Sequence, residues 1–316
     1  MRTFLAKRMV QTLVVLLGVS LMTFFMMNLA PGDPYHMDPD MRMNPQAVAR
    51  WKELRQLDRP LHEQYISWLM NLLKGDFGIS LIHNRPVLEL ITDRLPATLL
   101  LTGASLLAAL FIAIPLGIIS AVKQGTFVDK FISFFTLFGV SVPNFWLGML
   151  LILLFAHYLN WLPSSGIRTV GAGSSFYDYM KHLILPVVVL STGSAAYYIR
   201  YIRAGVLEVI GQDYILTAWA KGLRGKTVLF RHILRNAMIP VVTVVSLSLP
   251  FLFTGAMVTE YVFSWPGMGR WIIMATLSRD YPSVLAVNVI VAALVALCNL
   301  GADLLYAYFD PRIKYR

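Results

Sequence analysis

Residues 96–122 read PATLLLTGASLLAALFIAIPLGIISAV, a run without Asp, Glu, Lys, Arg or His. A bilayer core about 30 Å thick needs about 20 such residues in one helix, because the backbone polar groups must be satisfied within the segment. The run is therefore predicted to cross a membrane. The whole composition agrees: 57% of the 316 residues are hydrophobic and 14% are charged, whereas a soluble domain carries roughly a quarter charged residues.

Further apolar segments flank this run on both sides. The six predicted spans are Val10–Leu29, Pro96–Val122, Phe131–Leu162, Leu183–Ile199, Ala237–Thr259 and Tyr281–Ala302. The first is interpreted as a retained span, because its apolar part is too long for a signal peptide and Pro31 follows Ala30. The predicted fold is an all-α membrane protein with six transmembrane helices, and the even number places both termini on one side.

The positive charges are distributed unevenly between the predicted loops. Loops on the side of the termini contain fifteen Lys and Arg, while the short loops on the other side contain four. Short cytoplasmic loops carry an excess of Lys and Arg, so both termini are predicted to be cytoplasmic. This topology explains the net charge of +10, and no nucleic-acid partner is expected.

The chain is predicted to have four parts. Residues 1–29 form the N-terminal segment and first span, 30–95 an extracytoplasmic loop, 96–306 a five-helix core that includes a cytoplasmic loop over 204–236, and 307–316 a cytoplasmic tail. The extracytoplasmic loop contains two stripes at helical spacing, which either pack on the bundle or also form a landing surface for an outside partner. The stripes are Ile66, Leu69, Met70 and Leu73, and then Val87, Leu88, Ile91 and Leu95.

The cytoplasmic loop is predicted to form two helices joined by a turn. Good helix formers surround Ala218, and Gly222 and Gly225 interrupt the helical pattern. A basic anchoring loop would explain the charges of this stretch but not its second apolar face, which consists of Val228, Leu229, Ile233 and Ala237.

This loop resembles the signature loop of ABC-importer permeases, whose form is Glu-Ala-Ala, three residues, Gly, nine residues, Ile-x-Leu-Pro. Ala218, Gly222 and Leu234 match that form. The departures are Leu216, Thr217, His232 and Arg235, which stand in place of Glu, Ala, Ile and Pro. The sequence from Asp213 to Gly222, followed by Arg-His-x-Leu-Arg-Asn-Ala, is similar to the variant typical of oligopeptide and dipeptide permeases.

The resemblance to peptide permeases covers the whole chain through short motifs in a fixed order. These are Pro31-Gly32-Asp33-Pro34, Gly75-Asp76-Phe77-Gly78-x-Ser80, Pro143-Asn144-Phe145-Trp146, Glu260 ahead of Phe263-x-x-Pro266-Gly267-x-Gly269, Arg279-Asp280-Tyr281-Pro282, and Asp310-Pro311-Arg312.

The resemblance implies a type I ABC-importer permease in a bacterial inner membrane, the pore-forming subunit of an ATP-driven importer of peptides. The implied partners are a second homologous permease, two ATP-binding subunits, an extracytoplasmic peptide-binding protein and membrane lipids. Implied ATPase-coupling residues are Asp213, Ala218, Gly222, Phe230, His232, Leu234 and Arg235. Implied residues of an extracytoplasmic gate or docking site are Glu260, Pro266, Gly267, Gly269 and Asp280.

Two alternatives to peptide import stay open. The same machinery would suit another solute, such as a nickel chelate, glutathione or an oligosaccharide. A secondary transporter is the other alternative, although no carboxylate sits at the middle of a predicted span, where ion coupling usually places one.

No catalytic residue, metal site or cofactor is predicted. Residues 220–227 imitate a phosphate-binding P-loop, but a working P-loop follows a buried strand within an α/β domain. Ser141 and His157 are separated by about four helical turns, too far apart for a nucleophile and its base. The chain is therefore not expected to be an enzyme, and ATP hydrolysis is assigned to separate subunits.

Overall fold

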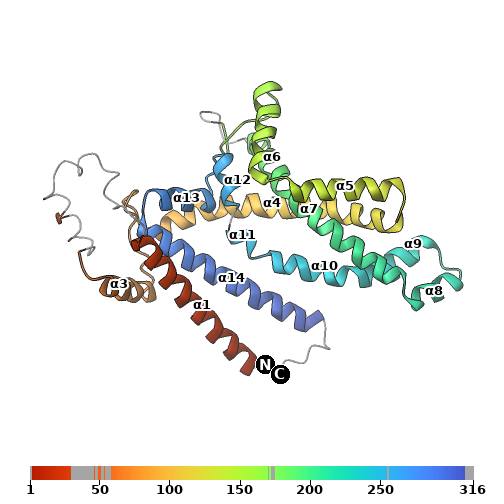
Figure 1. Cartoon of the computed structure of the whole chain (residues 1–316), viewed down its shortest axis with the longest axis horizontal. Coiled ribbons are helices and arrows are strands. Elements are labelled where there is room, and N and C mark those ends of the chain that lie inside the picture. The colour runs from red at the N-terminus through yellow and green to blue at the C-terminus, as the bar shows by residue number, and fades with distance from the viewer. Residues whose placement is uncertain are drawn as a thin grey trace.

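The computed structural model describes residues 2–29, 58–169, 171, 175–254 and 256–309, with isolated positions at 46, 49, 50 and 53. The described chain is almost entirely helical (Figure 1). Its helices are α1 (Arg2–Leu29), α3 (Leu61–Leu73), α4 (Val87–Val122), α5 (Phe127–Ser141), α6 (Asn144–Leu151), η3 (Ile152–Tyr158), α7 (Phe176–Ile210), α8 (Asp213–Ala220), α9 (Gly225–Thr227), η4 (Val228–Ile233), α10 (Leu234–Ser248), α11 (Phe251–Thr254), α12 (Met257–Val262), α13 (Met268–Leu277) and α14 (Tyr281–Phe309).

Five of the described helical stretches are long and apolar enough to cross a membrane. They are Arg8–Leu29, Val87–Val122, Phe176–Ile210, Gly225–Phe253 and Tyr281–Gly301. Each overlaps one of the predicted spans. The boundary predicted between residues 95 and 96 falls inside α4, which continues through Pro96.

The predicted span Phe131–Leu162 is not one straight helix. The structure divides this region into α5 and the α6–η3 helix, which are bent by 101° at a short break. A bent pair of this kind is either a broken span or a re-entrant loop, so the described chain has five candidate spans, or six if the pair crosses the membrane as one. The break lies at Val142 and Pro143, where Val142 is extended with φ −85° and ψ 123°. A proline disfavours helical geometry in the preceding residue and lacks the N–H that would continue the helix, which explains the bend.

Helix α7 lies at the centre of the described bundle and packs on α4, α5, α6 and α10. Close approach depends on small residues at three contacts. A Cβ on Gly117 of α4 would lie 2.7 Å from Ile202, one on Gly139 of α5 would lie 3.0 Å from Ala196, and one on Gly205 would lie 3.0 Å from the carbonyl oxygen of Ala237.

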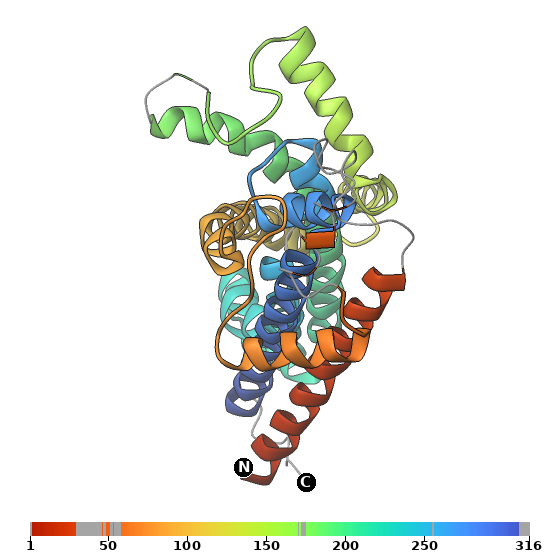
Figure 2. The ribbon, with the colours of Figure 1, turned by 90° about the vertical axis from the view of Figure 1, so that its left-hand side faces the viewer.

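Helices α1 and α14 pack side by side in antiparallel orientation. The N-terminal end of α1 and the C-terminal end of α14 lie at the same end of the molecule in both views (Figures 1 and 2). The two motifs predicted around Pro31 and Asp310 lie outside the described residues.

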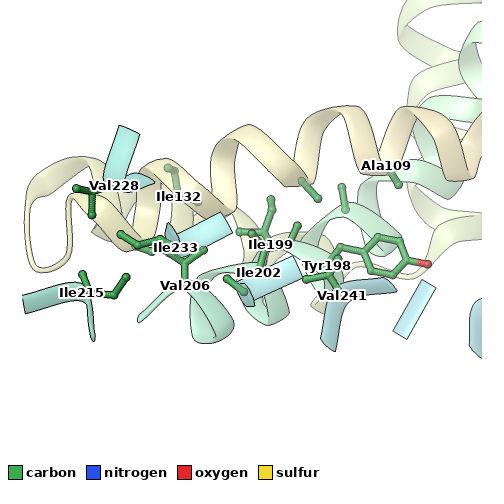
Figure 3. Close-up of a cluster of buried hydrophobic side chains, with 14 of the residues drawn as sticks. Ala109, Ile132, Tyr198, Ile199, Ile202, Val206, Ile215, Val228, Ile233 and Val241 are labelled. Atoms are coloured by element: carbon green, nitrogen blue, oxygen red, sulfur yellow. The ribbon is translucent and has the colours of Figure 1, made fainter. Parts of the chain in front are cut away.

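A single hydrophobic cluster runs along α7 and connects most of the bundle (Figure 3). Ala109 and Ala113 of α4 and Ile132 of α5 contribute to it, together with residues of α8, η4 and α10. Val206 of α7 is fully buried within it. The cluster therefore joins the short helices after α7 to the helices that cross the membrane.

The two stripes predicted in the outer loop behave differently. Ile66, Met70 and Leu73 on α3 are exposed, and no described residue of α3 is buried. In contrast, Val87 and Ile91 in the first turns of α4 are buried against α13 and α14. Leu69 is half-buried, so within the described part of the chain only the second stripe contributes fully buried residues to the bundle.

Candidate functional site

The predicted helix–turn–helix is present between α7 and α10. We call residues 213–233, which contain α8, α9 and η4, the α8–η4 hairpin. Gly222 makes its turn with φ +72°, and its N–H donates to the carbonyl oxygen of Trp219 at 2.9 Å. A Cβ on Gly222 would meet no atom within 4 Å. The glycine is therefore required by backbone conformation rather than by lack of space.

One face of the α8–η4 hairpin is anchored in the bundle. Ile215 and Ala218 of α8 and Val228 and Ile233 of η4 are buried in the cluster along α7 (Figure 3). Asn236 Nδ2 also donates to the hydroxyl oxygen of Tyr214 at 3.2 Å, which links α10 back to α8. The hairpin therefore packs against α7 and is linked to α10.

Outside this buried face, the α8–η4 hairpin exposes large apolar side chains. Leu216, Trp219 and Phe230 are 61%, 50% and 67% exposed. We call these three residues the apolar patch. Exposed apolar patches bordered by charged residues are typical of protein–protein contact surfaces. The neighbouring basic residues in the chain are Lys221, Arg224, Lys226, Arg231 and Arg235.

The seven residues predicted to couple this loop to an ATPase do not form one surface. Ala218 is buried, and His232 and Leu234 are half-buried. The exposed members are Asp213, Gly222, Phe230 and Arg235. Leu216 and Trp219 were not predicted, although their i, i+3 spacing on the face next to Ile215 and Ala218 was a usable signal.

A buried ion pair beside the hairpin was also not predicted. Asp129 of α5 accepts from Arg203 Nε and from a second guanidinium nitrogen, both at 2.9 Å. Ser120 Oγ donates to the same carboxylate at 2.5 Å, and the Gly125 N–H donates at 2.9 Å. The Asp129 side chain is 7% exposed and that of Arg203 31%. This pair fastens the α4–α5 turn to α7.

At the other end of the bundle, Glu260 of α12 lies in a fully buried polar pocket. Its Oε1 accepts from Thr98 Oγ1 at 2.9 Å and its Oε2 from the Arg270 N–H at 3.0 Å. The Met268 N–H donates in turn to Thr98 Oγ1 at 2.7 Å. Burial raises the pKa of the Glu260 carboxyl, while the hydrogen bonds from Arg270 and Thr98 oppose that rise.

Gly267 and Gly269 make room for this carboxylate. A Cβ on Gly267 would collide with Glu260 Oε2 and Thr98 Oγ1, and one on Gly269 would lie 2.7 Å from the Met257 backbone. Trp265 links the same loop to α4: its Nε1 donates to the carbonyl oxygen of Ala97 at 2.8 Å. The loop from Phe263 to Gly269 is therefore held against α4 through Glu260.

Asp280 joins the outer loop to the start of α14. Its Oδ1 accepts from the Leu81 N–H at 2.9 Å, and its Oδ2 accepts from Ser80 Oγ at 2.5 Å and Ser283 Oγ at 2.7 Å. Of the five predicted gate or docking residues, only Pro266 is exposed. Glu260 and Asp280 hold loops in place from the interior, and neither carboxylate is available for direct contact with another protein.

No group of three or more His, Cys, Asp or Glu suited to a metal ion occurs among the residues that the structure describes. The P-loop imitation follows the helix α8 and a turn rather than a strand. This segment therefore lacks the structural context of a nucleotide site.

These observations define a helical membrane protein with several spans, whose bundle carries an anchored hairpin with an exposed apolar patch. The chain belongs to the family of binding-protein-dependent transport system inner membrane components: residues 113–315 match that family, and residues 1–102 match its N-terminal region. It is thus the multi-pass inner-membrane subunit, in a family that implies ATPase and binding-protein partners. ATP hydrolysis takes place in separate subunits.

Several curated relatives match over the full length. The chain is 41% identical over 316 residues to the oligopeptide transport system permease protein AppB of Bacillus subtilis, covering all of both chains. It is 38% identical to the dipeptide transport system permease protein DppB of Escherichia coli, and 40% to the di/tripeptide permease DppB of Pseudomonas aeruginosa, again over both full chains. A crystal structure of an amino acid ABC transporter with histidines aligns with 71% of this chain and 94% of its own at 17% identity and a TM-score of 0.49.

Proposed function

We propose that this chain is the pore-forming permease of an ATP-driven, binding-protein-dependent importer of peptides. The observation that carries this proposal is full-length identity of 38–41% to permeases named for oligopeptide, dipeptide and di/tripeptide transport. Each alignment covers all of both chains, so the likeness includes the outer loop as well as the membrane core.

In the proposed assembly, a second homologous permease completes the pore and two ATP-binding subunits dock beneath it. Both termini and the α8–η4 hairpin face the cytoplasm, while the 30–95 loop and the Glu260 region face outward. The uneven distribution of Lys and Arg supports this orientation. The apolar patch of Leu216, Trp219 and Phe230 supports contact with an ATPase, because such a surface is unfavourable in water.

Coupling is proposed to pass from the ATPases to the spans through the α8–η4 hairpin. The hairpin shares one packed cluster with α4, α5, α7 and α10, so its displacement moves these helices together. Packed cores shift between discrete arrangements rather than deforming continuously. Closure of the ATPases on ATP would thus switch the bundle between outward and inward access.

On the outer side, the loop from Phe263 to Gly269 and the Ser80–Asp280 junction are proposed to form part of a gate or of the docking surface for the binding protein. Glu260 and Asp280 would act by positioning these loops, with Pro266 at the exposed edge. Their buried hydrogen bonds support this role.

Reconstitution tests the proposed function. The chain, its partner permease, the ATPases and the binding protein are placed in proteoliposomes, and uptake of a labelled tripeptide is measured with and without ATP. Saturable, ATP-dependent uptake supports the proposal. Uptake of a nickel chelate, glutathione or an oligosaccharide in place of peptides would contradict the substrate, and peptide uptake driven by an ion gradient without ATP would indicate a secondary transporter.

A further inference from the structure

A cavity of about 720 Å³ lies between α4, α6, α7, α10 and α11. Its lining combines hydroxyl groups and aromatic rings: Thr102, Ser105, Ser194 and Ser248 lie beside Tyr197 and Tyr201. None of the described residues that line it is Asp, Glu, Lys, Arg or His. Its volume falls within the range of about 300–1,000 Å³ typical of small-molecule sites.

Two interruptions of the membrane helices border this cavity. Asn144 follows the break at Pro143, and Leu252 and Ala256 lie where the chain leaves α10 before α12 begins. Non-helical backbone at membrane depth is tolerated only where it is buried in protein or lines a water-filled space. Both interruptions border the same cavity, which is the arrangement that a water-filled path would require.

The hydroxyl groups in this cavity present acceptors. Ser105 Oγ donates to the carbonyl oxygen of Leu101 at 2.7 Å, and Ser248 Oγ donates to that of Val244 at 2.9 Å. Thr102 Oγ1 lies 2.8 Å from the carbonyl oxygen of Thr98 and 3.1 Å from that of Leu252. Since their protons are committed to the backbone, these oxygens accept hydrogen bonds from whatever enters, and a peptide backbone supplies N–H donors.

The cavity is also mechanically connected to the α8–η4 hairpin. Tyr198 lines the cavity and belongs to the hydrophobic cluster that contains Ile215, Val228 and Ile233 (Figure 3). A movement of the hairpin that shifts α7 therefore changes the cavity wall. This is the property that a substrate path in an ATP-driven pump requires.

We propose that this cavity is the chain's share of the translocation pathway and that it accepts peptides through their backbone, without selecting the charge of their side chains. The inference rests on the proposed function and specifies how its substrate is received. With no fixed charge in the wall, cationic, neutral and acidic peptides meet the same electrostatic environment. Charge selectivity of the whole importer would then arise outside this subunit's path.

The test introduces one charge into the wall. Ser194 is exposed to the cavity on α7, so Ser194→Lys places an ammonium group in the path, and Ser194→Gln supplies similar bulk without charge. ATP-dependent uptake of Ala-Lys-Ala, Ala-Ala-Ala and Ala-Glu-Ala is measured in proteoliposomes with the complete complex and saturating binding protein. Ser194→Lys should lower the Lys-peptide to Glu-peptide uptake ratio about tenfold relative to Ser194→Gln, because like charges a few ångström apart in a narrow, protein-walled path repel even when the path holds water.

A second variant guards against failure of the first to assemble. Ser194→Asp should shift the same ratio in the opposite direction, which general destabilisation would not do. Ser133 lies exposed on α5 and does not line the cavity, and Ser133→Gln should leave all three rates unchanged.

Unchanged uptake ratios in both charged variants would overturn the inference. An equal loss of uptake for all three peptides would also overturn it, because it would indicate that Ser194 packs against the partner permease. Absence of peptide uptake by the wild-type complex would instead refute the proposed function. That result is distinct, because it appears before any substitution is made.

Discussion

The ion pair between Asp129 and Arg203 allows a quantitative test of how the α4–α5 turn is held to α7. Asp129→Ala removes four hydrogen bonds to one carboxylate, two of them from Arg203. Breaking a fully buried pair costs about 3–5 kcal/mol, because the remaining charge is left without a partner. Arg203 keeps 31% of its side chain exposed, so part of that cost is recovered by solvation. We expect a loss of about 2–3 kcal/mol in the free energy of unfolding.

The assay is a double-mutant cycle with Asp129→Ala, Arg203→Ala and the double variant. The purified chain in mixed micelles is titrated with SDS, and helix content is followed by circular dichroism. The coupling energy between the two positions should be about 1–2 kcal/mol. A matched control is the same cycle with Arg85→Ala and Glu89→Ala, because these residues form a pair at 3.2 Å with both side chains about half exposed. Such pairs contribute about 0–1 kcal/mol.

A coupling energy below about 0.5 kcal/mol for Asp129 and Arg203, equal to that of the exposed pair, would refute the reasoning. It would show that Arg203 is satisfied equally well by water or by lipid headgroups. The hydrogen bonds to Ser120 and Gly125 would then suffice to hold the turn.

Three further predictions concern the hairpin, the outer pocket and the topology. Gly222→Val should assemble but lose peptide uptake and the stimulation of ATPase activity by the loaded binding protein, because a φ of +72° costs a β-branched residue about 1–2 kcal/mol. The control is Gly18→Val, which lies in open space on α1. Full uptake by the Gly222 variant would contradict the coupling role. Gly267→Ala should lower the free energy of unfolding by about 1–3 kcal/mol, because the added methyl group overpacks against Glu260. Pro266→Ala, at the exposed neighbouring position, should leave it unchanged. Equal effects of the two substitutions would argue against a tight carboxylate pocket. Single cysteines at Gly125 and Gly171 in a Cys298→Ala background should label oppositely with an impermeant maleimide in intact cells, and labelling from the same side would overturn the topology.

The membrane spans were predictable because hydrophobic length alone specifies them. Pro96–Val122 and Tyr281–Ala302 each lie within a single helix of the structure. The hairpin was predictable for a related reason, since glycine at the turn and apolar residues at helical spacing on both sides favour only one local fold. In the structure, Gly222 makes this turn with a positive φ.

The break at Pro143 was less accessible from sequence. A proline inside an apolar run is compatible with a kinked span, and α4 indeed continues through Pro96 and Pro115. What differs at Pro143 is the tertiary setting. Gly139 lies close to α7 just before the break, and Gly148 packs against Phe263 just after it. Contacts of this kind are long-range and leave no periodic signal in one chain.

The same limit applies to the polar residues that the structure pairs. Asp129 and Arg203 are separated by 74 positions, and Ser80 and Asp280 by 200. The sequence shows only that Arg203 lies at the end of an apolar segment, where a charge without a partner is costly. A long Arg side chain can avoid that cost by reaching to the membrane interface, so no partner needs to be inferred. The partner of such a residue depends on which helices meet.

The motif around Glu260 supports two interpretations, a gate or docking site and a packing motif. The resemblance to peptide permeases implied that Glu260, Pro266, Gly267 and Gly269 belong to a gate or docking site. In the structure, both glycines are buried, and a side chain at either would strike the Glu260 carboxylate or its surroundings. The two glycines therefore provide space for the buried carboxylate, which explains why glycines follow Glu260 at these positions. Any gate built on this loop must move Glu260, Thr98 and the start of α13 as one unit, because their hydrogen bonds leave no single member free to open alone.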